Sequence, residues 1–179
     1  IRSFLTVAFS RFNPKPDSRI SKITSHGEKK TMESLLKDFY RDYAFFSTEY
    51  SFYGDRYYVL KEGGEIIAGV NALPSTYKIY DIPGVWGWVI MNVLPRSPYY
   101  KRLFHPEEFR HVIFDALYCK KGCEEVLPDL FETVCAMEGF NTGLLWLDDH
   151  SDLYDILRTS TRMGAINRML NAKPGLVYA

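Results

Sequence analysis

Residues 110–139 read RHVIFDALYCKKGCEEVLPDLFETVCAMEG, and the fold can be worked out from this stretch. Arg110 to Cys119 predicts a central strand covered on both sides, because apolar residues occupy both of its alternating faces. One predicted face holds Val112, Phe114, Ala116 and Tyr118, and the other Ile113, Asp115 and Leu117. The basic turn Lys120–Gly122 then leads into a helix over about 124–138, which Gly139 ends.

Upstream of this stretch, two β-rich runs flank a pair of glycines. Tyr57–Leu60 and Ile66–Val70 lie on either side of Gly63 and Gly64, a pattern that predicts an antiparallel hairpin next to the central strand. Pro74 is expected to interrupt the second run.

Helical spacing of apolar residues from Met32 to Tyr43 predicts another helix, starting near Lys29 with Thr31 as its N-cap. The remaining assignments follow composition: a short strand over residues 18–24, a buried strand over 142–147, a helix capped by Ser151 or Asp152, and extended segments over 163–170 and 175–179.

The domain organisation is inferred from the ends and from one insertion. Residues 1–18 predict a leading strand and a linker with two prolines, and residues 19–179 one domain. The chain opens on isoleucine, so we expect a piece of a longer polypeptide with a neighbouring N-terminal domain. Residues 83–108 form an aromatic insertion, either a lid over an acceptor or a surface for that neighbour. At least one of Trp86 and Trp88 is expected to be exposed.

Composition narrows the function classes. The 22 basic residues balance the 22 acidic ones among 179, so no net field recruits nucleic acid or an anionic membrane. Cys119, Cys123 and Cys135 form no disulfide framework and no zinc-ligand spacing. We therefore expect reduced thiols in a cytoplasmic protein without a metal. No apolar run approaches the length of a membrane span.

Several segments together resemble the GNAT superfamily, the general N-acetyltransferases. They are YYVLKEGGEIIAGV, FDALYCKKG with its helix, GLLWLDD, and LYDIL followed by Met163-Gly164. The resemblance covers most of the chain and implies an α/β fold, with a mixed central sheet and helices on both faces. It also implies an acyl-CoA-dependent N-acyltransferase that uses acetyl-CoA and a small-molecule or peptide amine acceptor.

In that family the central strand ends in a diphosphate-binding turn, R/Q-x-x-G-x-G/A. Gly122 matches its first glycine, whereas Cys119 and Glu124 replace the other two residues. The resemblance makes the whole turn the candidate coenzyme A site: Tyr118, Cys119, Lys120, Lys121, Gly122, Cys123 and Glu124. A helix N-terminus favours an anion, but Glu124 would repel a diphosphate. A tight turn without a ligand, in a non-catalytic scaffold domain of a larger acetyltransferase, is the alternative.

Two residues are candidates for proton transfer. Asp115, predicted to be buried in an apolar strand, would be the general base, or would simply be paired. Tyr154 would be the acid, although the position that the family pattern indicates before Gly164 is Ser160. His111 and His150 are expected to be solvated or to cap strand ends.

Overall fold

The computed structural model describes residues 2–43, 46–169 and 175–177. Its strands form one seven-stranded sheet in the order β2-β3-β4-β5-β6-β1-β7, in which only β5 and β6 are parallel neighbours. In chain order the elements are β1 (Arg2–Ser10), β2 (Ile20–Lys22), α1 (His26–Phe39), β3 (Tyr57–Glu62), β4 (Glu65–Tyr77), α2 (Val85–Asn92), β5 (Phe109–Cys119), α3 (Leu127–Glu138), β6 (Thr142–Asp148), α4 (Asp152–Thr159), α5 (Ala165–Met169) and β7 (Gly175–Val177).

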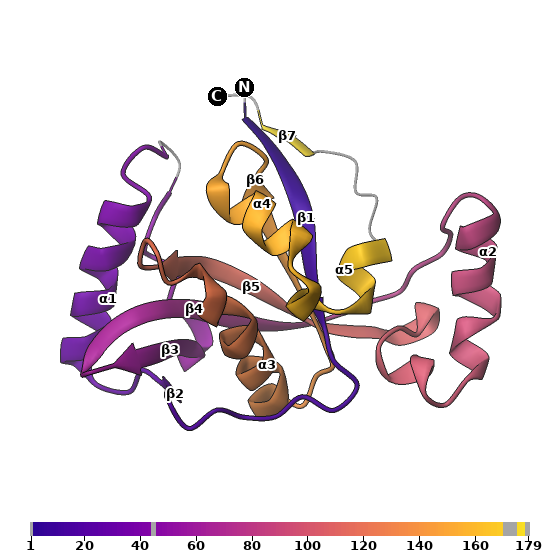
Figure 1. Cartoon of the computed structure of the whole chain (residues 1–179), viewed down its shortest axis with the longest axis horizontal. Helices are drawn as coiled ribbons and strands as arrows, with labels where there is room; N and C mark the ends of the chain where they lie inside the picture. The colour runs from indigo at the N-terminus through magenta and orange to yellow at the C-terminus, as the bar shows by residue number, and fades with distance from the viewer. Residues whose placement is uncertain (1, 44–45, 170–174, 178–179) are drawn as a thin grey trace.

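Helices pack on both faces of this sheet (Figure 1). On one face, α3 and α4 bury Phe131 and Leu157 against strands β1, β4, β5 and β6. On the other face, α1 buries Met32 and Leu36 against Tyr57 and neighbouring strand residues. The predicted α/β class, with a mixed sheet covered on both sides, is therefore confirmed.

The predicted hairpin and central strand are also confirmed. β3 and β4 are antiparallel around Gly63 and Gly64, whose φ angles of 57° and 85° suit a tight hairpin turn. β5 lies between β4 and β6. The interruption expected at Pro74 is wrong, since β4 continues to Tyr77. The pairing with β3 ends at Asn71, so the missing N–H of Pro74 costs no bond on that side.

A β-bulge in β5 changes the faces predicted for this strand. Ala116 has a φ of 46°, and the register with β4 shifts between Gly69 and Asn71. The bulge puts Asp115 and Ala116 on the same side, so the alternation reverses after Asp115. Leu117 consequently packs into the core under α3, while Ala116 packs toward α1.

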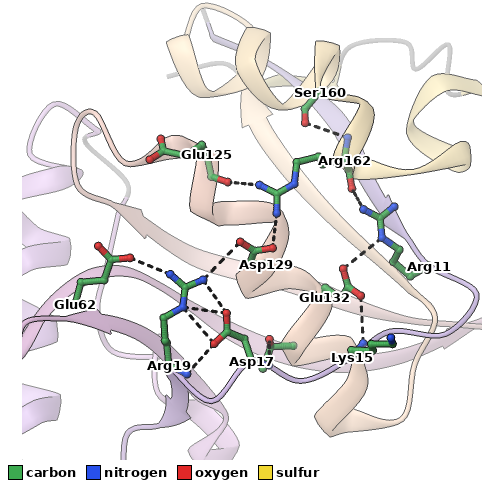
Figure 2. Close-up of polar contacts among 11 residues, drawn as sticks. Arg11, Lys15, Asp17, Arg19, Glu62, Glu125, Asp129, Glu132, Ser160 and Arg162 are labelled. Atoms are coloured by element: carbon green, nitrogen blue, oxygen red, sulfur yellow. Dashed lines mark hydrogen bonds and ion pairs between the residues drawn. The ribbon is translucent and has the colours of Figure 1, made fainter.

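The leading strand and linker are held against the rest of the chain. β1 pairs with β6 from Phe4 to Ser10, and Phe9 is fully buried. Residues 11–19 cross α3 through polar contacts, which Figure 2 shows. Arg11 Nε lies 3.3 Å from Glu132, and Arg19 reaches Glu62 at 3.0 Å. Exposed pairs of this kind contribute at most about 1 kcal/mol each, so the buried strand anchors this region more than its linker does.

Two further predictions, both concerning helices, are wrong. Helix α1 begins at His26 rather than near Lys29, because the Ser25 hydroxyl accepts a hydrogen bond of 3.1 Å from the Glu28 N–H. Thr31, the expected cap, instead donates to the Gly27 carbonyl inside the helix. The segment expected to be extended after Met163 forms the short helix α5, whereas the predicted cap Ser151 of α4 is confirmed.

The aromatic insertion contains the apolar helix α2 and three short 3₁₀ turns. In Figure 1, α2 stands apart from the sheet, at the far end of the molecule from α1. Trp88 is 61% exposed, which confirms the expectation that at least one tryptophan faces solvent. The side chain of Trp86 lies outside the part that the structure describes.

Candidate functional site

Strands β5 and β6 separate soon after they meet. Their parallel pairing consists of Val112 with Gly143 and Ile113 with Leu144. Beyond these pairs β5 follows β4 as far as Cys119, and β6 follows β1 as far as Asp148. The bulge at Ala116 bends β5 in this region. The carboxyl ends of the two strands therefore diverge and leave a gap between them.

A cavity of about 490 Å³ occupies this gap and is walled by α1, α4, both strand ends and the turn after β5. Its lining is mostly apolar and aromatic and consists of Phe4, Phe39, Tyr40, Tyr43, Cys119, Lys121, Glu124, Trp146, Leu147, Asp148, Ser151, Asp152, Leu153 and Ile156. The volume falls in the range of small-molecule sites. The candidate functional site is this cavity, called the β5–β6 cleft below.

Asp148 is the buried carboxylate of the β5–β6 cleft. Only 6% of the residue is exposed, and the Tyr43 hydroxyl lies 3.4 Å from its Oδ2. The backbone N–H of His150 donates to Oδ1 at 3.0 Å. The Ser151 hydroxyl donates to the Asp148 carbonyl and accepts from the Tyr154 N–H, which fixes the strand end to the start of α4. Asp148 is thus an acidic group held in place inside an apolar cleft.

Two tyrosines satisfy the carbonyl groups around the bulge. The Tyr40 hydroxyl donates to the Leu117 carbonyl at 2.6 Å, and the Tyr57 hydroxyl donates to the Ala116 carbonyl at 2.7 Å. Burial, with a further contribution from the Asp115 charge, raises the pKa of both phenols far above the usual value. Both hydroxyls therefore stay protonated and hold the bent strand that forms one wall of the cleft.

The two residues predicted to transfer protons are not in the cleft. Asp115 is exposed rather than buried, and it pairs with Asn71 of β4 immediately before the bulge. Tyr154 is half-buried and packs against the main core. Neither is among the described residues that line the cavity, so the structure does not bring them together there.

In the predicted diphosphate turn, several hydrogen-bond donors are already bonded to acceptors within the protein. The Gly122 N–H donates to the Glu124 carboxylate at 2.9 Å, and the Cys123 N–H donates to the Lys120 carbonyl at 3.0 Å. The Lys120 ammonium pairs with Glu65 at 2.7 Å on the hairpin. Lys121 and Glu124 line the cleft. The Glu124 carboxylate thus accepts a bond that a bound anion would otherwise accept.

The two residues before that turn are packed rather than available. Tyr118 is 8% exposed, with its ring 5.7 Å from the Phe39 ring. Cys119 is 3% exposed. Burial, followed by the charges of Glu124 and Glu125, raises the pKa of its thiol to about 12, so Cys119 is not a nucleophile at neutral pH.

Arg162 lies beside the start of α3 and was not predicted from the sequence. Its guanidinium donates to the Glu125 carbonyl at 2.8 Å and pairs with Asp129, as Figure 2 shows. A second cavity of about 280 Å³ lies here and shares Glu124 and Ile156 with the β5–β6 cleft. The β5–β6 cleft and this second cavity therefore adjoin at Glu124 and Ile156, and the second cavity reaches the guanidinium of Arg162.

The end of β6 also carries an acid cluster. Ligand atoms of Asp148, Asp149 and His150 lie within 4.8 Å of one another. Contacts within the cluster and with its neighbours account for this spacing, because His150 Nδ1 lies 2.5 Å from Asp149 and Ser3 donates to the same carboxylate. We assign no metal to it.

His150 is exposed, as expected, whereas the solvated role expected for His111 is wrong. His111 is fully buried between the rings of Tyr77 and Phe109, and its Nε2 has no hydrogen-bond partner among the described residues. Burial lowers its pKa below the usual 6.5, although the contact of Nδ1 with the Phe109 carbonyl partly opposes this.

This depressed pKa predicts a pH-dependent stability. As the pH falls below 6.5, the unfolded chain binds a proton at His111 that the folded chain does not, so the free energy of unfolding decreases. His111→Phe should flatten this dependence between about pH 6.5 and pH 5. Urea unfolding of both proteins across this range measures it. An unchanged slope in the variant would contradict the assignment.

Comparison of the sequence with protein-family models gives no match, and comparison with curated proteins gives none. Among the described residues, no helix combines the length and apolar character needed to cross a membrane.

Proposed function

We propose that the protein is an acyl-CoA-dependent N-acyltransferase, which transfers an acetyl or related acyl group to a small-molecule or peptide amine. The observation that carries the proposal is the divergence of β5 and β6 beyond Ile113 and Leu144, which opens the β5–β6 cleft. An extended thioester arm suits a slot between two strand edges, whose backbone groups lack strand partners. The sequence resemblance to the GNAT superfamily supports the same function.

Different residues of the cleft would cover the acyl arm, bind the diphosphate and take up the proton in such a reaction. The apolar walls, including Leu147 and Trp146, would cover the acyl arm, while Lys121 and Arg162 would face the diphosphate beside the start of α3. The amine nitrogen forms a bond to the thioester carbonyl carbon, the C–S bond breaks, and the amine proton must leave. Asp148 is better placed than Asp115 to take this proton, because it lines the cleft.

The second candidate is a non-catalytic scaffold domain beside a neighbouring N-terminal domain of a larger acetyltransferase. The hydrogen bond from the Gly122 N–H to Glu124 favours it, because this carboxylate must move before an anion can bind. The pairing of Lys120 with Glu65 favours it too. In either role, the three free cysteines fit the reducing cytoplasm, which we propose as the compartment.

Titration with coenzyme A distinguishes the two candidates. We expect weak binding by the natural chain and three- to tenfold tighter binding by Glu124→Ala, since roughly 0.7–1.4 kcal/mol of like-charge repulsion at a helix start is removed. Lys121→Ala should weaken binding by a similar factor and added salt should weaken it further. Lys37→Ala, a similar change on the exposed face of α1, is the control and should leave the affinity unchanged.

Activity provides the second readout. With acetyl-CoA and a panel of amines, Asp148→Asn should lower the release of free thiol while leaving coenzyme A affinity nearly unchanged. If neither the natural chain nor Glu124→Ala binds coenzyme A, the acyltransferase proposal fails. Binding without thiol release with any amine would favour the scaffold domain.

A further inference from the structure

A third pocket lies at the opposite end of β5 from the cleft. It has a volume of about 290 Å³ and is enclosed by the end of the insertion, the start of β5 and the turn after α3. At about 3.3 Å per residue, Arg110 in this pocket and Cys119 in the cleft are roughly 30 Å apart along β5. The insertion contributes no described residue to the cleft lining, which argues against the lid that the sequence suggested.

The wall of this pocket is fixed to the body of the protein. The Thr142 hydroxyl donates to the Leu103 carbonyl at 2.9 Å in a buried contact, and the Ile79 N–H donates to the Pro106 carbonyl at 2.8 Å. Leu103 is 5% exposed and Pro106 is buried. The segment between them, which supplies His105, is therefore held at both ends, and the pocket is largely preformed.

Positive charge is concentrated in this pocket. Lys101, Arg102 and Arg110 line it together with one carboxylate, Glu108, and with His105. Within residues 2–43, 46–169 and 175–177, no carboxylate forms an ion pair with any of the three cations. Arg19 and Lys120, by contrast, are each paired. The Arg110 guanidinium lies 5.1 Å from the centre of the Phe140 ring, an arrangement that orients its planar donors.

We propose that this pocket binds a small dianion, a phosphate monoester or a dicarboxylate. Arginine side chains present paired donors that match carboxylate and phosphate oxygens, and a concave site with unpaired cations concentrates the field on such a ligand. Glu108 and the carbonyl end of α3 oppose an anion, but the three cations outweigh them, and this net positive charge favours a dianion over a monoanion. The volume suits a ligand of few atoms rather than a nucleotide.

Titration with inorganic phosphate and, separately, with succinate tests this proposal and shows which chemistry is preferred. We expect saturable shifts of the Phe140 and Asn141 backbone amides and of the Arg110 Nε–H resonance, which weaken as salt is added. Arg110→Gln should lower affinity at least tenfold. Arg41→Gln, a change to an exposed arginine just after the end of α1, should not alter it.

Two further variants keep the test decisive. Arg110 packs on Phe140, so the double variant Lys101→Gln, Arg102→Gln, at exposed positions, must lower affinity by a similar factor even if Arg110→Gln unfolds. Lys121→Gln should leave these shifts intact, because it lies in the β5–β6 cleft. Absence of saturable shifts with both anions, or equal loss in Lys121→Gln, would overturn the proposal without bearing on the coenzyme A experiment.

Discussion

Replacing Gly143 by alanine should lower the free energy of unfolding by about 3 kcal/mol, at the upper end of the usual cost of overpacking. A Cβ atom at Gly143 would lie 2.1 Å from a carbon of the Phe114 ring. That ring is 3% exposed and stacks on Phe131 with 4.5 Å between centroids, so it has little room to move. Thermal unfolding should show a fall in Tm of roughly 6–12 °C.

The matched control is Gly27→Ala. No atom lies within 4 Å of a Cβ built at Gly27, which is in the first turn of α1. Alanine there should be neutral or stabilise by up to about 1 kcal/mol, since it is the better helix former. Equal melting temperatures for Gly143→Ala and the natural chain would show that β5 and β6 are not packed as closely as the structure has them.

Gly143 also decides where the β5–β6 cleft begins. It pairs with Val112 at the point from which the two strands diverge, and only a residue without a side chain lets the Phe114 ring pass beneath it. This close approach brings β6 next to β5, and the bulge at Ala116 then bends β5 within the region where the two separate. The cleft thus depends on one small residue and one local irregularity.

Local signals explain what the sequence could predict of the fold. The hairpin at Gly63-Gly64 and the helix before Gly139 each depend on residues within a few positions of one another. The bulge at Ala116 depends on distant residues instead. Tyr40 comes from the end of α1 and Tyr57 from β3, and both donate to carbonyls of β5. A single-residue change of register then reversed the predicted faces beyond Asp115.

The same distinction applies to the candidate site: features formed by neighbouring residues could be predicted, and features formed by distant residues could not. The turn at Gly122 was recognisable because strand, glycine and helix follow one another directly. In the sequence, Glu124 could be recognised only as an unfavourable negative charge. The hydrogen bond that its carboxylate accepts from the Gly122 N–H is seen only in the structure. Asp148 and Arg162 were missed because their roles arise from contacts with Tyr43 and with the start of α3, which are far away in the sequence.

Truncation of Phe131 to alanine should lower the free energy of unfolding by about 3–5 kcal/mol, the usual cost of removing a buried aromatic ring. Phe131 is fully buried on α3, and its ring contacts those of Phe9 and Phe114, with centroids 6.3 and 4.5 Å away. Urea unfolding measures the change. Met137→Ala is the control on the same helix: Met137 is 49% exposed, so the expected loss is below about 1 kcal/mol.

Phe131→Ala should also partly rescue Gly143→Ala. Removing the Phe131 ring leaves a space into which the Phe114 ring can move, away from the new Cβ at residue 143. The double variant should therefore be more stable than the sum of the two single losses predicts, by about 1–2 kcal/mol for residues in direct contact. Strict additivity would mean that the clash at Gly143 is relieved elsewhere, and the stack of Phe114 on Phe131 would then not be what holds β5 against β6.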